Sequence, residues 1–156
     1  IGLRGLSLVC NAAYIHSRVR FEDGAPERDR PLAGQSPYLV NAGLFYQHDD
    51  KGISASLLYN RIGKRIESVG VPMQNQNEDI PDIYEMPRNS LDLTFSKKIG
   101  KVVEIKAGIQ DMLNSKIEYK QFVKLADENG GKREREQLVR SYRPGVDINV
   151  GVSLKF

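Results

Sequence analysis

The final residues of the chain, GVDINVGVSLKF (145–156), alternate without a break between apolar and polar side chains. The apolar positions are Val146, Ile148, Val150, Val152, Leu154 and Phe156. The polar or small positions are Asp147, Asn149, Gly151, Ser153 and Lys155. Successive side chains of a β-strand point to opposite faces of its sheet, so this pattern predicts a strand with one apolar and one polar face. Chain ends fray unless something holds them, and we therefore expect this strand to be paired.

Five further segments have the same period of two. They are residues 6–17, 38–48, 53–60, 90–99 and 102–110. Together with the last strand they predict an all-β chain of six antiparallel up-and-down strands, each beside its neighbour in sequence. A helix over any of these segments would contradict the prediction.

The connections between the predicted strands alternate between short and long. Residues 48–52 and 99–101 predict tight hairpin turns, because Gly and Asp suit the backbone of such turns. Residues 19–36, 66–88 and 125–142 predict long charged loops that hold most of the prolines. This alternation is typical of outer-membrane barrels, with periplasmic turns and external loops. It would place residues 48–51 and 100–101 in the periplasm and the loops near Glu27, Asn77 and Asn129 outside the cell.

Charged residues are segregated by parity as a membrane barrel requires. Those on the polar parity are Asp92, Lys98, Glu104, Lys106, Asp147 and Lys155. The apolar parity is nearly free of charge, with Lys97 beside a tight turn as the exception. A Lys or Arg facing lipid at the bilayer midplane costs about 2–4 kcal/mol, so this division suits a wall with lipid on one side and water on the other.

Two further features fit part of a membrane barrel: the number of predicted strands and the positions of four tyrosines. The smallest outer-membrane barrels have about 8 strands, and an open six-stranded sheet leaves two bare edges. We therefore expect residues 1–156 to be the carboxy-terminal part of a larger barrel whose earlier strands precede Ile1. Four tyrosines fall on the apolar parity, either as girdle residues at the membrane interfaces or as ordinary strand aromatics: Tyr14, Tyr38, Tyr46 and Tyr59.

The composition excludes several other classes of protein. The chain is 40% hydrophobic and 28% charged, and no apolar run approaches the roughly 20 residues of a membrane-spanning helix. The net charge of +3 comes from 23 basic and 20 acidic residues that are interspersed along the chain. They form no dense basic patch of the kind that would indicate nucleic-acid binding. The single cysteine, Cys10, forbids an internal disulfide and a multi-cysteine metal site. Its place in a strand pattern indicates a small apolar residue, buried or facing lipid.

No catalytic, cofactor or metal site is predicted. The two histidines, His16 and His48, are not at metal-ligand spacing, and His48 lies in a tight turn where a solvated role is expected. Residues 75–82 (NQNEDIPD) have some of the oxygen-rich spacing of a calcium loop, but Ile80 and Met86 replace its glycine and glutamate. A solvated loop is the simpler interpretation, and a calcium site shared with other loops is the alternative. Binding by the long loops fits better than catalysis.

Five blocks resemble the carboxy-terminal barrel of TonB-dependent outer-membrane receptors, especially those of Bacteroidota. They are RPLAGQSPYLVNAGLFY (30–46), YNRIGKRI (59–66), YEMPRNSLDLTFSKKIG (84–100), GIQDMLNSK (108–116) and YRPGVDINVGVSLKF (142–156). The family often carries Gly-x-x-Asn-Leu-Phe-Asp/Asn-Lys in its penultimate strand. Gly108 and Asn114 match this motif. The departures are Asp111, Met112, Leu113 and Ser115.

The resemblance implies a barrel of about 22 strands in the bacterial outer membrane. It also implies an amino-terminal plug domain, energy supplied through TonB, and uptake of a nutrient such as an iron chelate, cobalamin, a glycan or a peptide. The plug and the TonB-contacting segment are not in this sequence. The alternative is a small soluble β-barrel or sandwich that acts as a ligand-binding module and stays monomeric without detergent.

The last strand resembles the signal read by the β-barrel assembly machinery. Such recognition works by strand addition, in which backbone pairing gives affinity and pockets for alternate side chains give specificity. Phe156 would be the anchor, with four apolar residues in step behind it: Leu154, Val152, Val150 and Ile148. The alternative is that Phe156 only contributes to an aromatic girdle.

Overall fold

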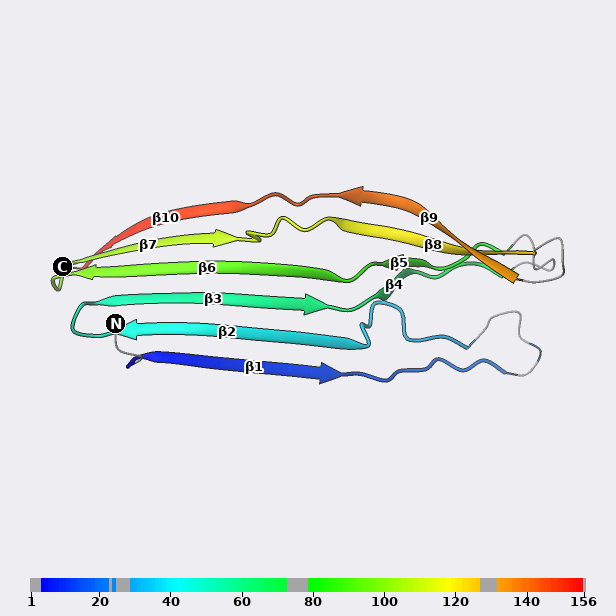
Figure 1. The fold of residues 1–156 in the computed structure, drawn as a ribbon, viewed down its shortest axis with the longest axis horizontal. Helices are drawn as coiled ribbons and strands as arrows, with labels where there is room; N and C mark the ends of the chain where they lie inside the picture. The colour runs from blue at the N-terminus through cyan, green and yellow to red at the C-terminus, as the bar shows by residue number, and fades with distance from the viewer. Residues whose placement is uncertain (1–3, 23, 25–28, 73–78, 127–131, 156) are drawn as a thin grey trace.

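The computed structural model describes residues 4–22, 24, 29–72, 79–126 and 132–155, without the side chains of 124–126 and 132. Its regular structure consists of ten β-strands in two antiparallel sheets (Figure 1). The sheets follow one another along an elongated molecule. Within these ranges the chain forms no helix that is able to cross a bilayer.

The first sheet contains the six predicted strands, in the order β1-β2-β3-β6-β7-β10. They are β1 (Leu6–Tyr14), β2 (Tyr38–His48), β3 (Ile53–Ile62), β6 (Arg88–Ile99), β7 (Val103–Gln110) and β10 (Asp147–Leu154). Each is antiparallel to the next. The all-β class and the up-and-down order are therefore confirmed. Tight turns join β2 to β3 and β6 to β7, as predicted.

The second sheet lies in two segments that the sequence predicted as loops and in residues 117–124, to which the sequence assigned no element. Its strands, in the order β4-β5-β8-β9, are β4 (Arg65–Ser68), β5 (Ile83–Glu85), β8 (Ile117–Ala126) and β9 (Lys132–Tyr142). The prediction of long loops over 66–88 and 125–142 was wrong for these parts. The reason is that three strand pairs of the first sheet continue beyond a short break. The pairs β3–β6, β6–β7 and β7–β10 are followed by the pairs β4–β5, β5–β8 and β8–β9.

One register runs through the break from the β3–β6 pair to the β4–β5 pair, whereas at the neighbouring β7–β10 pair Ile117 comes seven positions after Gln110 and Asp147 comes five positions after Tyr142. Ile62 of β3 pairs with Arg88 of β6, and three residues further on Arg65 of β4 pairs with Glu85 of β5. Because the count of residues is equal on both strands, side chains keep the same alternation on either side of the break. Each side of the first sheet therefore continues into the corresponding side of the second.

The pairing register gathers most of the apolar residues of all six strands on one side of the first sheet; the exceptions on the opposite side are Val9, Leu39, Phe45, Leu58 and Ile62. One row across it consists of Leu8, Leu44, Leu57, Leu93, Ile109 and Ile148. We call this the apolar side and the opposite one the polar side. Tyr14, Tyr38, Tyr46 and Tyr59 lie on the apolar side, as predicted.

Almost nothing is buried. Among the described residues, the only buried large hydrophobic side chains are those of Ile66, Ile117 and Tyr119, all in the second sheet. The first sheet is a single layer with no core on either side. Its internal stability therefore comes from backbone pairing and from contacts between neighbouring side chains within each side.

Gly63 marks a close approach at the break. A Cβ at this position would lie 2.7 Å from Cε1 of Tyr38 and 2.9 Å from Oγ of Ser36. The Gly63 N–H also donates to the Tyr38 carbonyl at 3.1 Å, so the backbone has little freedom to move away. Only a residue without a side chain fits here.

We expect Gly63→Ala to lower the free energy of unfolding by about 1–3 kcal/mol, the usual cost of an added methyl in a filled site. Thermal unfolding followed by circular dichroism measures the change. Gly151→Ala is the matched control, because a Cβ at Gly151 meets nothing within 4 Å. Equal losses in the two variants would show that close packing at Gly63 is not the cause.

Candidate functional site

The apolar side of the first sheet is uncovered. Leu8 is 69% exposed and Val150 is 73% exposed, although both belong to the apolar pattern. The chain has 11,666 Å² of accessible surface, whereas a folded soluble monomer of 17.6 kDa has about 7,900 Å². Exposed apolar patches beyond a few hundred Å² mark surfaces that bind protein or membrane. This side is therefore the first candidate functional surface.

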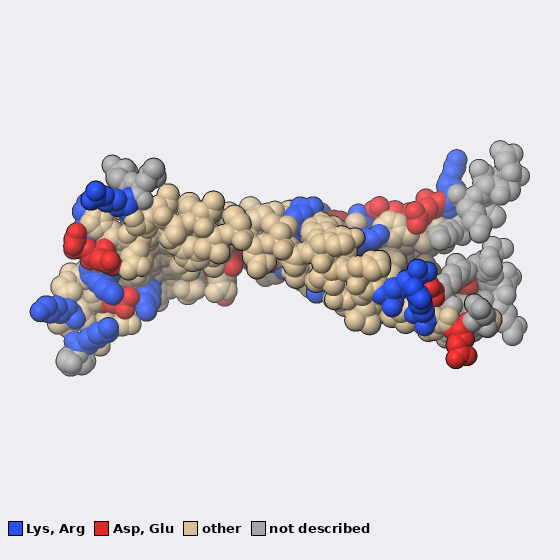
Figure 2. All heavy atoms as spheres, turned by 90° about the horizontal axis from the view of Figure 1, so that it is seen from below, with Lys and Arg blue, Asp and Glu red and all other residues tan. Residues whose placement is uncertain are grey.

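Polar groups limit the apolar side at both ends. At the end near the second sheet, the Tyr59 hydroxyl and the Arg61 guanidinium both donate to Oδ1 of Asn89, at 2.8 and 2.9 Å. At the tight-turn end, the Lys97 ammonium donates to the Lys51 carbonyl at 2.5 Å. Figure 2 shows the same division, with most charged residues towards the two ends of the molecule.

The height between these limits suits a bilayer. From Asn89 to Lys97 a strand rises roughly 27 Å along its own axis, or about 20 Å if it tilts by about 40°. Long polar side chains reach outward from both limits and add to this span. The apolar band of outer-membrane barrels is about 25 Å tall.

The polar side carries a ladder of small hydrogen-bonded residues. The Ser54 and Ser96 hydroxyls lie 2.7 Å apart, and the Ser56 and Thr94 hydroxyls 2.6 Å apart. The Asn60 amide donates to the Asn41 amide oxygen in the same way. These cross-strand pairs form a hydrophilic strip, which suits contact with water or with a polar domain, and the apolar side chains of Val9, Phe45 and Leu58 lie on the same side.

A left-handed turn follows β7 on the polar side. Asp111 and Asn114 have φ values of 51° and 43°, and they are the non-glycine residues with positive φ among those described. Asp and Asn tolerate this conformation better than most residues. The Asp111 N–H donates to a carboxylate oxygen of Asp92 at 2.8 Å, and the Asn114 side chain accepts from the Gly145 N–H at 3.1 Å. The motif position Asn114 thus joins β7–β8 to β9–β10 across the break.

An ion pair holds this turn against β6. The Arg88 guanidinium donates to Oδ2 of Asp111, and both side chains are largely buried. Nε of Arg88 and Oδ1 of Asp111 have no hydrogen-bond partner in the described part of the chain. Sequence reasoning identified Gly108 and Asn114 in this region but missed the ion pair.

Two cation–aromatic clusters lie on opposite sides of the second sheet. On the polar side, the Lys64 ammonium is 4.4 Å from the Tyr84 ring centre and 4.5 Å from that of Phe122. Because the register of β3–β6 continues into β4–β5, this cluster lies on the same side as the ladder of hydroxyl pairs, past the break. Such a mixture of cation and aromatic ring is a suitable surface for a polar ligand.

The other cluster continues the apolar side. Arg140 pairs with Tyr119, and its guanidinium lies 4.2 Å from the Tyr119 ring centre and 5.8 Å from that of Tyr142. Tyr119 in turn pairs with Glu85, which carries an ion pair with Arg65 at 2.7 Å. The apolar side therefore becomes charged and aromatic beyond its band.

Lys120 is the centre of an ionic cluster on the polar side of the second sheet. Its ammonium lies 2.6 Å from a Glu136 oxygen and 3.3 Å from a Glu118 oxygen. These hydrogen bonds, first with Glu136 and then with Glu118, raise the pKa of Lys120. The cluster ties β9 to β8 where β9 forms the free edge of its sheet.

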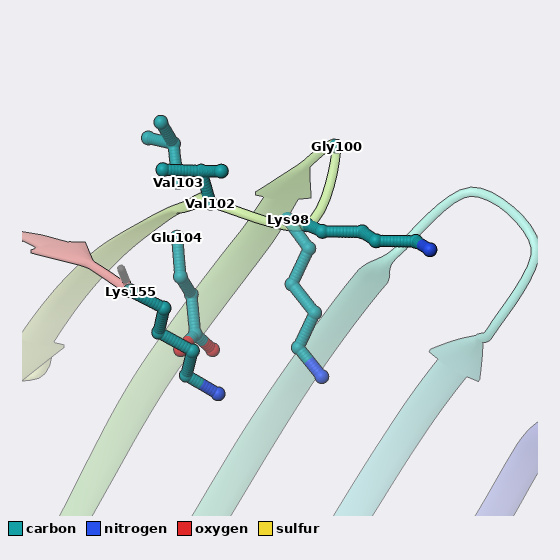
Figure 3. Close-up of a pocket in the computed structure, with 7 residues that line it drawn as sticks. Lys98, Gly100, Val102, Val103, Glu104 and Lys155 are labelled. Carbon is teal, nitrogen blue, oxygen red and sulfur yellow. The ribbon is translucent and has the colours of Figure 1, made fainter.

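A shallow hollow lies at the tight-turn end, between the β6–β7 turn and the end of β10 (Figure 3). Lys98, Lys155 and Glu104 line it, and Val102 and Val103 form its apolar part. The Glu104 carboxylate has its nearest described ion-pair partner in Lys106, at 3.6 Å.

The predicted assembly residues lie on the uncovered apolar side of β10. Ile148, Val150, Val152 and Leu154 are all more than half exposed. β10 pairs only with β7 among the described strands, so its other edge is open. Phe156 lies outside the described residues.

The remaining candidates carry no site chemistry. Cys10 is an exposed free thiol on the apolar side, and His48 ends β2 at the turn. Asn75 and Asn77 of the candidate calcium loop lie outside the described residues. Within the described ranges, no group of three or more His, Cys, Asp or Glu residues is arranged to hold a metal ion.

Comparison of the chain with protein-family models, with curated proteins and with solved structures finds no match.

Asp111 offers a test of the turn and its ion pair. Asp111→Ala removes the partner of Arg88 and places an alanine at positive φ, so we expect it to cost about 2–4 kcal/mol in urea unfolding. Asp111→Asn removes the charge but keeps a residue that tolerates this φ, and about 1–2 kcal/mol is expected. If both variants unfold like the parent protein, neither the ion pair nor the turn supports the fold.

Proposed function

We propose that residues 1–156 form part of the wall of a TonB-dependent outer-membrane transporter. In this proposal the apolar side faces lipid and the polar side faces the lumen, where a plug domain and a nutrient are accommodated. The second sheet extends the wall beyond the outer surface of the membrane. The tight turns lie in the periplasm.

The uncovered apolar side is the single observation that carries the proposal. Its band consists of the three rows that contain Leu91, Leu93 and Phe95, and it is limited by a Tyr–Arg–Asn group at one end and a lysine at the other. A bilayer supplies an apolar layer between two polar interfaces, and so it covers such a surface completely. A soluble partner would need an apolar surface of the same height and the same polar limits.

The open edges of β1 and β10 support a larger closed sheet. A free edge is a row of unpaired backbone N–H and C=O groups, which in a bilayer costs several kcal/mol for each group. Further strands would pair with both edges and close the wall. The remainder of the barrel is thus the proposed partner of both edges.

Neighbouring positions on β6 test which side meets lipid. Leu93 lies in the middle row of the apolar side, and Thr94 lies next to it on the polar side. We expect Leu93→Arg to reduce the free energy of insertion by about 2–4 kcal/mol, whereas Thr94→Arg is tolerated. Refolding of the protein from its complete gene into lipid vesicles, followed by heat-modifiable gel mobility, measures both.

Equal tolerance of the two arginines would contradict the proposal. So would a protein that is monomeric in detergent-free buffer and gives a dispersed NMR spectrum. That result would favour the soluble ligand-binding module instead.

Recognition by the β-barrel assembly machinery is tested at the last residue. If the open edge of β10 is paired with the machinery through Phe156, deleting Phe156 lowers the folded yield at the cell surface several-fold. Refolding into detergent micelles should be largely unchanged, because no machinery takes part in it. Equal losses in cells and in micelles would assign Phe156 to packing. Leu154→Ala should act in the same direction but less strongly.

A further inference from the structure

Lysines gather at the tight-turn end of the first sheet. The β2–β3 and β6–β7 turns lie side by side, since Ile53 pairs with Lys97 and the Lys98 N–H donates to the Gly52 carbonyl at 2.7 Å. The end of β10 joins them through the Lys155 N–H, which donates to the Val102 carbonyl at 2.8 Å. Five lysines are brought together in this way: Lys51, Lys97, Lys98, Lys101 and Lys155.

These lysines are poorly neutralised. None of the five forms an ion pair with a carboxylate that the structure describes. The acidic residues nearby are Asp49 and Asp50 in the turn, and Glu104, whose described ion pair is with Lys106. Asp49 accepts a hydrogen bond from the Gln47 side chain at 2.6 Å. This end of the molecule therefore carries an excess of positive charge, and Figure 2 shows blue residues interspersed with red ones at the end opposite the second sheet.

One of these lysines, Lys97, borders the apolar side directly, whereas Lys98 and Lys155 lie on the polar side. Lys97 lies on that side, between Ile53 on one neighbouring strand and Ile105 on the other. Ile99 is 52% exposed beside it, and the exposed Val102 lies in the hollow with Lys101. Positive charge and uncovered apolar surface thus meet along one line at the rim of the sheet.

A ligand that satisfies both features must carry a negative group next to an apolar chain. A soluble anion, such as phosphate, would neutralise the lysines but leave the apolar side exposed. An acidic protein segment would neutralise the lysines, but it would also need an apolar surface positioned to cover the adjacent apolar side. An anionic phospholipid has the two parts in the required order, with its phosphate at the interface and its acyl chains along the band.

We propose that the tight-turn end is a binding site for the headgroup of an anionic phospholipid, with Lys97 and Lys101 as its principal cations and Lys51 beside them. The inference rests on the proposed function, because it requires the apolar side to face a bilayer. The headgroup phosphate lies between the two turns, and the acyl chains follow Ile53, Ile99 and Val102 into the band. Lysine attracts the phosphate as a point charge, which suits a headgroup that remains mobile.

Mixed micelles that contain phosphatidylglycerol or phosphatidylcholine with identical acyl chains test the site. The protein from its complete gene is purified in them, and the lipid it retains is measured by native mass spectrometry over a range of lipid concentrations. We expect retention of phosphatidylglycerol at lower concentrations than phosphatidylcholine. Each lysine near a membrane surface contributes about fivefold in affinity, so Lys97→Gln with Lys101→Gln should weaken phosphatidylglycerol binding roughly 25-fold. Phosphatidylcholine binding should change little.

The matched control removes two cations at the other end. Arg133→Gln with Arg135→Gln changes the net charge equally, and neither arginine has an ion pair with a residue that the structure describes. We expect this variant to bind phosphatidylglycerol like the parent. Equal weakening by both double variants would reduce the effect to net charge and overturn the site. Displacement of the lipid by millimolar inorganic phosphate would overturn the choice of a lipid ligand.

Insertion separates this inference from the proposed function. A parent protein that refolds into phosphatidylcholine vesicles with heat-modifiable mobility, but does not prefer phosphatidylglycerol, refutes the headgroup site alone. A parent protein that fails to insert into any vesicle refutes the membrane wall and, with it, the site.

Discussion

Backbone pairing within one layer is the constraint on which the structure depends. The first sheet has no second layer, so its six strands are held by their ladders and by contacts between neighbours on each side. A chain of this length normally buries a core, and this one leaves 11,666 Å² accessible. The two sides therefore have to be stabilised by different surroundings. The apolar rows require an apolar layer, and the hydroxyl ladder requires water or polar groups.

The break between the sheets is built from residues with special backbone properties. Gly63 allows the close approach of Tyr38, and Pro87 has no N–H to offer to a ladder. Asp111 and Asn114 supply the left-handed turn on the neighbouring hairpin. The chain pairs again beyond these residues because the register between β3–β4 and β5–β6 is unchanged. The break thus interrupts the ladder without altering which side each residue faces.

Hydropathy alternation made the six strands of the first sheet predictable, but it did not indicate β4, β5 and β9 of the second sheet. In β9 the alternation is between signs of charge: Arg133 and Arg135 are in step with one another, and Glu134 and Glu136 are in step on the other side. A pattern of this kind has no hydropathy contrast, so the sequence indicated a solvated loop. β4 and β5 are too short to show any period. The ion pair of Arg88 with Asp111 was not predictable, because a left-handed turn brings together residues 23 positions apart.

The residues of the predicted assembly signal could be identified from the sequence, whereas the group of lysines at the tight-turn end could not. Val150, Val152 and Leu154 were identified because alternation continues to the end of the chain. The lysines of the two turns are separated by about 50 positions, and only pairing of β3 with β6 brings Lys51 to Lys97. Their proximity is therefore a product of topology.

The break also determines where this wall is able to bend. Few ladder bonds cross it, and residues 111–116 and 143–146 interrupt the neighbouring hairpin at the matching place. A sheet folds most easily along such a crease, and the unchanged register means that no strand has to exchange partners when it does. In the proposed barrel, a bend at this crease towards the polar side would narrow the external mouth, and a bend away would widen it. In such a barrel the crease would act as a hinge above a lipid-facing band that keeps its pairing.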